Sequence, residues 1–242
     1  MLHTQKALLL IRFLLVGFLL SALQPVHAQR PLNLSDHDNK PYYFGITLST
    51  NLSRFQSELH PRFLNQDSIL VAEPMNGGGF ALGLLGTLKL TNRFEARFNP
   101  QLAFLDRGVH YKLRYADFDQ KTERDQKVES VLVTLPLQLK FNSDRIGNFR
   151  VYLVGGGKVD YDLASNARAR KADDILKLDK ADYGLEGGVG FNFYFPSFIF
   201  SPEIKISNGI RNIHARNPGL QYSNVLDKMQ SRMIMFSIHL EG

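Results

Sequence analysis

The sequence predicts an all-β fold: an eight-stranded antiparallel up-and-down transmembrane β-barrel with short periplasmic turns and long outer loops. Three observations predict it. Eight segments alternate apolar and polar residues with a period of two, their connections are alternately long and short, and their apolar side chains are too many for so narrow an interior. With 44% hydrophobic and 21% charged residues among 242, the chain is not disordered.

The first residues are set aside because they read as an export signal. Arg12 precedes an apolar run from Phe13 to Leu23, and Val26-His27-Ala28 supplies a small-residue cleavage pattern before Gln29. An uncleaved anchor helix is the alternative, but the uninterrupted run is shorter than the roughly 20 residues that a span needs. The expected organisation is a signal peptide at residues 1–28, a periplasmic N-terminal segment at 29–41 and an outer-membrane β-barrel domain at 42–242.

The eight strands share one alternation, in which a large apolar side chain follows each small or polar one. In the first strand, Phe44, Ile46 and Leu48 alternate with Gly45 and Thr47. The predicted strands are residues 42–54, 80–90, 94–104, 130–141, 149–162, 182–195, 198–207 and 233–240. The third is expected to continue through a further apolar set, assigned to the same outward face: Val109, Tyr111, Leu113 and Tyr115.

The connections alternate in length. The long ones are residues 55–78, 116–127, 163–180 and 208–228. The short ones are Thr91-Asn92, residues 142–147 and Pro196-Ser197. In an antiparallel barrel all the long connections then lie at one end, which is the arrangement of outer-membrane barrels, with turns in the periplasm and loops outside.

A soluble barrel of similar topology is excluded by volume. The apolar positions hold roughly forty side chains, whereas eight strands enclose only a few side chains or one small ligand. A water-facing band of that size would aggregate, so the apolar side must face lipid. The small and polar side then fills the lumen, where charges have to pair. The predicted lumen charge network is Glu95, Arg97, Lys140, Glu186, Glu203 and Lys205.

Aromatic residues gather at the end with the short turns. This clustering predicts a periplasmic girdle at the membrane interface, although aromatic residues are common in strands generally. The predicted girdle is Tyr42, Phe44, Phe94, Phe141, Phe149, Phe193, Phe195, Phe198 and Phe200, with Tyr43 and Tyr194 beside them. Four tyrosines are expected toward the opposite interface: Tyr111, Tyr115, Tyr161 and Tyr183.

Candidate chemistry is sparse. The absence of cysteine excludes disulfides, Cys-ligated zinc and thiol nucleophiles. His60 follows Ser57 and Glu58, and His214 follows Ser207, but their spacing fixes no nucleophile and base. Gly155-Gly156-Gly157-Lys158 lacks the Ser or Thr of a phosphate loop and lies within a strand. The sequence therefore predicts no enzyme, no catalytic residue, no cofactor and no metal.

Charge adds little about partners. Without Lys6 and Arg12 the formal charge falls from +6 to +4, since 27 basic residues then face 23 acidic ones. So small a surplus gives no reason to expect nucleic acid. Residues 163–180 mix both signs, so this segment is either a solvated loop or a contact for anionic lipopolysaccharide or a protein.

Four stretches resemble a known family: ESVLVTLPLQLKF at 129–141, RVYLVGGGKVDYDLAS at 150–165, DYGLEGGVGFNFYFPSFIFSPEIKISNGIRN at 182–212 and DKMQSRMIMFSIHL at 227–240. They look like the PorT (SprT) proteins of Bacteroidota. The resemblance implies an outer-membrane barrel required for type IX secretion of cargo with C-terminal sorting domains and for gliding motility. Its implied partners are outer-membrane lipids and other secretion components. The residues alone leave open a structural or adhesion barrel, a lipid-modifying enzyme and a narrow pore.

Overall fold

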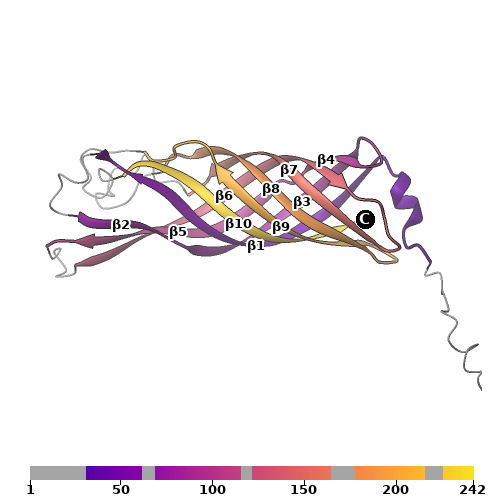
Figure 1. Ribbon diagram of the computed structural model, residues 1–242, viewed down its shortest axis with the longest axis horizontal. Coiled ribbons are helices and arrows are strands. Elements are labelled where there is room, and N and C mark those ends of the chain that lie inside the picture. Colours follow the sequence, from indigo (N-terminus) through magenta and orange to yellow (C-terminus); the bar gives the residue numbers. More distant parts are fainter. Residues whose placement is uncertain (1–30, 62–68, 116–121, 165–177, 216–225) are drawn as a thin grey trace, which may run out of the picture. The chain divides into compact units, whose positions relative to one another are not determined.

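The computed structural model describes residues 31–61, 69–115, 122–164, 178–215 and 226–242. The predicted signal peptide lies outside them. The unit Leu32–Gly242 holds a short 3₁₀ helix and ten antiparallel strands (Figure 1). They are η1 (Ser35–Asn39), β1 (Tyr42–Leu59), β2 (Ile69–Met75), β3 (Gly77–Lys89), β4 (Phe94–Phe98), β5 (Gln101–Leu113), β6 (Glu123–Asn142), β7 (Phe149–Asp162), β8 (Ala181–Tyr194), β9 (Ile199–Gly209) and β10 (Leu226–Glu241).

The ten strands form a closed ring of eight. Asn76 alone separates β2 from β3, and Asn99-Pro100 separates β4 from β5, so each of these pairs is one barrel strand with a break. Pro100 has no N–H to give to a ladder, which explains the second break. β10 pairs with β1, and β1 pairs with β3, which closes the ring. The predicted eight-stranded antiparallel barrel is confirmed. No helix in the described ranges is long and apolar enough to cross a membrane.

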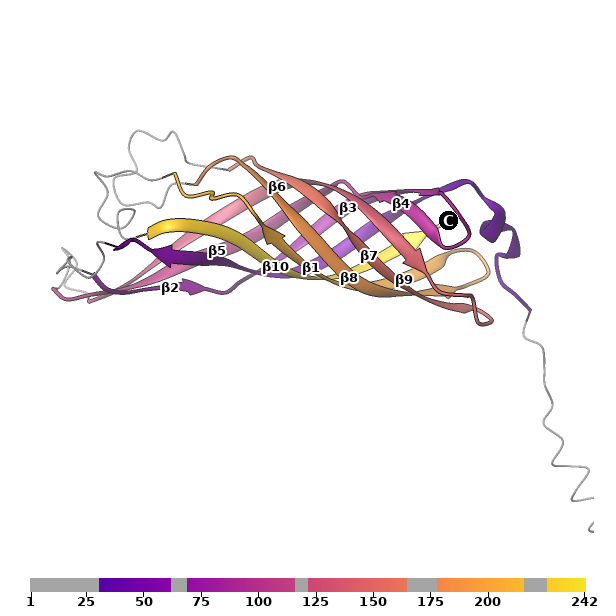
Figure 2. The same cartoon turned by 45° about the horizontal axis from the view of Figure 1, so that its top comes forward.

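The apolar band faces outward, as predicted. On β1, Phe44 is 67% exposed and Leu48 46%, while Thr47 and Ser49, the two neighbours of Leu48, are buried. The strands wind obliquely around the barrel (Figure 2), and the same alternation runs through β6, β8 and β9. A period of two therefore assigns one parity of each strand to the outer surface and the other to the interior.

The strands are longer at the end with the long connections than the alternation predicted. β1 extends to Leu59, β6 begins at Glu123 and β10 begins at Leu226. Here the polarity of the two faces is reversed: on β1, Phe55 is buried and Gln56 exposed. These strand ends rise beyond the apolar band, so their outer side chains meet water and their inner ones can be apolar.

The outward assignment of Val109, Tyr111 and Leu113 is wrong, because all three point inward. They belong to a buried outer apolar cluster, which also includes residues of two connections, Leu178 and Ile213. Ile213 donates its backbone N–H to Met229 O over 2.9 Å, which ties its segment to β10. The cluster is Phe55, Ile69, Ala72, Val109, Tyr111, Leu113, Leu178, Ile213, Leu226 and Met229. It fills the outer part of the interior.

The pairing between β1 and its neighbour stops at one point. Ser53 opposite Gly77 is the last pair of β1 with β3. Beyond it, the ladder of β1 is with β10 and that of β2 is with β5 (Figure 1). A Cβ on Gly77 would lie 1.9 Å from the carbonyl oxygen of Asp106, so only glycine lets β3 and β5 approach so closely here.

Replacing Leu135 with Arg tests the lipid-facing assignment. Leu135 is 43% exposed in the middle of β6, and Arg at the bilayer midplane should lower the free energy of unfolding by about 2–4 kcal/mol. The measurement is urea unfolding in lipid vesicles. Glu129→Arg is the matched control, since Glu129 faces outward on the same strand beyond the apolar band; its cost should stay within about 0.5 kcal/mol. Equal costs at both positions would contradict the assignment.

Candidate functional site: a sealed and paired interior

Arg97 on β4 lies at the centre of the buried polar interior. Its Nη1 donates to Oε2 of Glu203 over 2.7 Å, and its Nη2 lies 3.6 Å from Oε1 of Glu241. The Tyr152 hydroxyl donates to the same oxygen of Glu203 over 2.9 Å. The side chains of Arg97, Glu203 and Glu241 are fully buried. A guanidinium suits this position because its planar fork reaches two carboxylates at once, one by a hydrogen bond and the other by an ion pair.

Lys140 on β6 is the second cation of the network. Its Nζ lies 3.6 Å from Oε2 of Glu95, 3.9 Å from Oε2 of Glu241 and 4.3 Å from the centre of the Tyr152 ring. Tyr43 donates its hydroxyl to Glu95 over 2.9 Å. Glu241 on β10 is therefore shared between Lys140 and Arg97, which joins the last barrel strand to the network. Tyr43 on β1 joins the first strand to it through Glu95.

A third pair completes it. Nζ of Lys205 on β9 lies 3.2 Å from Oε2 of Glu186 on β8, and Gln138 on β6 donates to the other oxygen of Glu186. Space for Tyr152 comes from Gly190, where an added Cβ would lie 2.3 Å from the tyrosine ring. The network thus depends on glycine at position 190, which leaves room for the Tyr152 ring, as well as on its charged side chains.

The structure brings all six residues predicted for the lumen network inside the barrel and pairs each of them. Four further members escaped the sequence reasoning: Tyr43, Tyr152, His239 and Glu241. Each lies at an inward position of its strand, so the parity of the alternation was a usable signal. Tyr43 and Tyr194, predicted beside the girdle, are 5% and 4% exposed, and Tyr111 is 0% exposed. The placement of these three at the membrane interfaces is wrong.

One arrangement has the form of a hydrolytic triad. Thr47 Oγ1 lies 2.8 Å from His239 Nδ1, and His239 Nε2 lies 3.4 Å from Oε2 of Glu203. All three residues are at most 1% exposed, so they contact no substrate from solution. Ser207 on β9 and His214, which were considered together in the sequence, are also buried, at 1% and 7%. In the described residues, these side chains are packed against one another and closed off from solvent.

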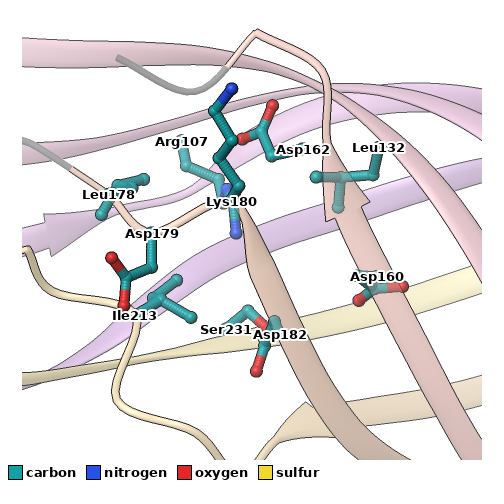
Figure 3. A pocket seen from close by; sticks show the side chains of 10 residues that line it. All are labelled: Arg107, Leu132, Asp160, Asp162, Leu178, Asp179, Lys180, Asp182, Ile213 and Ser231. Carbon is teal, nitrogen blue, oxygen red and sulfur yellow. The ribbon is translucent and has the colours of Figure 1, made fainter. Parts of the chain in front are cut away.

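A second group of polar side chains, including Arg107, Asp160 and Asp182, lies beside Leu178 and Ile213 of the outer apolar cluster (Figure 3). Nζ of Lys158 is 2.5 Å from Oδ2 of Asp160, and Ser231 donates to Oδ2 of Asp182 over 2.6 Å. Asp160, Asp182 and Arg107 line a cavity of about 10 Å³, the size of one water molecule. It is too small for an organic ligand. No group of three or more His, Asp or Glu residues in the described ranges is arranged to hold a metal ion.

Residues 33–40 lie against the end of the barrel that carries the short turns (Figure 2). The backbone N–H of Asn33 donates to Oδ1 of Asn148 over 2.9 Å. Asp38 is held by two cations: Nη1 of Arg145 lies 2.9 Å from Oδ2, and Nη2 of Arg150 lies 3.4 Å from Oδ1. We call residues 33–40 the periplasmic cap. It covers the interior at this end with backbone and paired charges.

His37 is the buried residue of the cap. It is 6% exposed, and its ring lies 4.5 Å from that of Tyr43. Burial lowers the pKa of His37 below its ordinary value, although the charge of Glu241 opposes that shift. Lys40 lowers the pKa of His37 further, and Asp38 and Glu95 act in the opposite sense. The cap is therefore stable with a neutral imidazole.

The aromatic residues predicted for the girdle lie on the outer surface. Seven are 38–67% exposed, and Phe149 and Phe200 are half-buried. Neighbouring rings contact one another. Along β1, the ring centroids of Tyr42 and Phe44 are 5.8 Å apart. Between strands, the centroids are 5.1 Å apart for Phe94 and Phe141, 5.2 Å for Phe149 and Phe193 and 6.3 Å for Phe193 and Phe200; within the β8–β9 turn they are 5.1 Å apart for Phe195 and Phe198. At the other end, Tyr115, Tyr161 and Tyr183 are 67%, 47% and 52% exposed.

Comparison with known proteins identifies the family. The outer membrane protein β-barrel domain matches residues 28–215. This chain belongs to that family. The barrel therefore resides in the cell outer membrane, its apolar band faces lipid, and outer-membrane lipids are its first partners. No curated protein matches the chain.

Three solved structures are among those to which this chain is similar. OprG of Pseudomonas aeruginosa is 16% identical with a TM-score of 0.42, covering 81% of this chain and 94% of its own. Neisserial surface protein A is 12% identical with a TM-score of 0.41, covering 81% and 96%. Ail, the attachment invasion locus protein of Yersinia pestis, solved with the heparin analogue sucrose octasulfate, is 14% identical with a TM-score of 0.39, covering 84% and 100%.

Removing Arg97 tests the coupling in the barrel's charge network. Arg97→Met leaves Glu203 and Glu241 without their guanidinium, and the free energy of unfolding should fall by about 3–5 kcal/mol. In the double variant Arg97→Met/Glu203→Gln the loss should be smaller than the sum of the two single losses, by roughly 1–3 kcal/mol. Unfolding in lipid vesicles gives all four values. Additive losses would show that the pair is not coupled.

The barrel's cap should loosen in acid. Because the pKa of His37 is lower when the cap is docked, the undocked state binds more protons, and docking weakens as pH falls below about 6.5. Hydrogen exchange of residues 33–40 should therefore be faster at pH 5 than at pH 7.5, beyond the intrinsic pH effect on exchange. His37→Phe keeps a ring against Tyr43 without a titrating group, and it should remove this pH dependence. An unchanged pH dependence in that variant would assign it to other groups.

Proposed function

We propose that this barrel is a non-enzymatic component of a type IX secretion system, required for export of cargo with C-terminal sorting domains and for gliding motility. The observation that carries the proposal is the resemblance of four stretches to the PorT (SprT) proteins. These stretches correspond to β6, β7, the β8–β9 hairpin and β10. These are consecutive neighbours in the sheet, so the resemblance covers one continuous side of the barrel.

The four stretches also contain side chains that lipid contact does not dictate. Outward positions need only be apolar, and many unrelated barrels meet that requirement. The four stretches supply much of the interior as well, including Lys140, Glu186, Glu203, Lys205 and His239. A resemblance over stretches that contain both outward and inward positions supports a specific family relationship more strongly than a resemblance of the apolar band alone.

The filled interior supports a role beside the conduit rather than as the conduit. The charge network, the second group of polar side chains and the outer apolar cluster all occupy the interior, and eight strands leave no room for a polypeptide. Because side chains fill the interior, the barrel would also conduct few ions. The barrel would serve the secretion system by contacting other components through its surfaces.

A second candidate is a structural or adhesion barrel. The observation that favours it is the length of four strands, β1, β5, β6 and β10, which reach past the apolar band and carry polar side chains on their outer faces. Such a projecting rim suits contact with a partner outside the cell. This candidate requires no secretion machinery, so a secretion assay separates the two.

Deleting the gene should cause cargo with C-terminal sorting domains to accumulate in the periplasm and disappear from the medium. The wild-type gene and the Glu129→Arg variant should restore export, whereas Leu135→Arg should restore it only as far as the barrel is present in the outer membrane. The measurements are cargo in each fraction and barrel in the outer membrane. Normal export in the deletion strain would refute the secretion role. Lost surface binding in that strain would then favour the adhesion candidate.

A further inference from the structure

The outer surface of the barrel carries a pair of arginines directly opposite each other. Arg54 on β1 and Arg232 on β10 are register partners, and both point outward. Directly opposed side chains in a sheet are about 5 Å apart at Cβ, and like charges so placed destabilise the pairing. In the described part of the chain neither guanidinium forms an ion pair. An anion bound between them would offset the repulsion.

The height of the pair on the barrel is defined by its strands. On β1, the outward positions from Tyr42 to Leu52 are apolar except for Thr50 and belong to the apolar band, and Arg54 is the next outward position. Ten residues of strand tilted by 35–45° rise roughly 24–28 Å, which matches the apolar band of an outer-membrane barrel. On β10, Arg232 is likewise the next outward position beyond Ile234. Both arginines therefore lie at the outer boundary of the hydrocarbon, on the side of the long connections.

A groove of about 370 Å³ opens at the same place. It is lined by Leu52, Ser53, Arg54, Asn76, Arg232 and Ile234. It lies where pairing between β1 and β3 ends and the chain breaks at Asn76. Leu52 and Ile234 are also register partners, so an apolar pair lies directly below the arginine pair. The groove thus combines an apolar floor toward the hydrocarbon with a cationic rim toward the outer surface.

We propose that this groove binds a phosphorylated glycolipid of the outer leaflet. A phosphate group would bridge the guanidinium groups of Arg54 and Arg232, because arginine's planar fork matches phosphate oxygens. An acyl chain of the same lipid would lie on Leu52 and Ile234. The apolar floor and the depth of the site favour a membrane lipid over a soluble anion.

Neighbouring charges leave the pair available. Glu58, two outward positions above Arg54, is 3.3 Å from Lys228, and Asp179 is 3.2 Å from Arg211. Asp106 faces outward on β5, and its backbone carbonyl accepts a hydrogen bond from Ser53 over 3.0 Å. The cross-strand partner of Asp106 is Glu129, so that sector of the same boundary is acidic and would repel a phosphate. The lipid site is therefore confined to the β1–β10 face.

Binding of purified full-length barrel to diphosphoryl lipid A in detergent, measured by native mass spectrometry, tests the site. Arg54→Gln and Arg232→Gln should each weaken binding roughly 10-fold or more, and the double variant should abolish it. Arg211→Gln is the matched control, since Arg211 is already paired with Asp179, and it should bind like the wild type. The characteristic heat-dependent gel shift of folded barrels verifies that each variant is folded.

Two further probes distinguish the sources of phosphate. Dephosphorylated lipid A should bind at least 10-fold more weakly than the phosphorylated form, and inorganic phosphate should not compete at millimolar concentration. Wild-type affinity in the folded double variant would overturn the site. Equal binding of dephosphorylated lipid A would overturn the role of the phosphate, and full competition by inorganic phosphate would overturn the assignment to a lipid.

Discussion

In hydrocarbon every backbone N–H and C=O group must find its hydrogen-bond partner within the protein, and this requirement governs the rest of the structure. Here it is met by β1, which pairs with β10 on one side and with β3 on the other. Closing after eight strands gives a narrow interior. That interior is filled by small side chains, by large polar ones that pair with one another, and by apolar ones such as Leu105 and Phe55. The lipid-facing positions need only be apolar.

The interior changes character along its length because the surroundings of the strands change. At the periplasmic end, Arg97, Lys140 and Lys205 are paired with four glutamates beneath a cap centred on His37. At the outer end, the strands stand in water and the inward positions are apolar, from Phe55 to Met229. Both arrangements fill the lumen. The surfaces, rather than the centre, are therefore where this barrel meets other molecules, including the outer-leaflet lipid proposed for Arg54 and Arg232.

Much of the architecture was predictable because lipid imposes a strict pattern. The alternation around Phe44 and Leu135 identified the strands and their outward faces, and the lengths of the connections identified the two ends. The prediction of outward-facing residues failed in β5, where the apolar residues switch from outward to inward positions. Val109, Tyr111 and Leu113 have the opposite parity to Leu102 and Phe104, which is a visible sign of reversal within one strand. Because these three residues occupy the inward positions of β5, they indicate an apolar interior beyond the membrane.

The sequence by itself determined the barrel, its facing within the membrane and the six charges of the lumen, because each depends on local alternation and on composition. Only the tertiary structure decided which charges meet. Glu241 joins Arg97 and Lys140 because the last strand closes on the first, and Arg54 faces Arg232 for the same reason. Residues that far apart along the chain are brought together by register, and register is a property of the closed sheet rather than of any single strand.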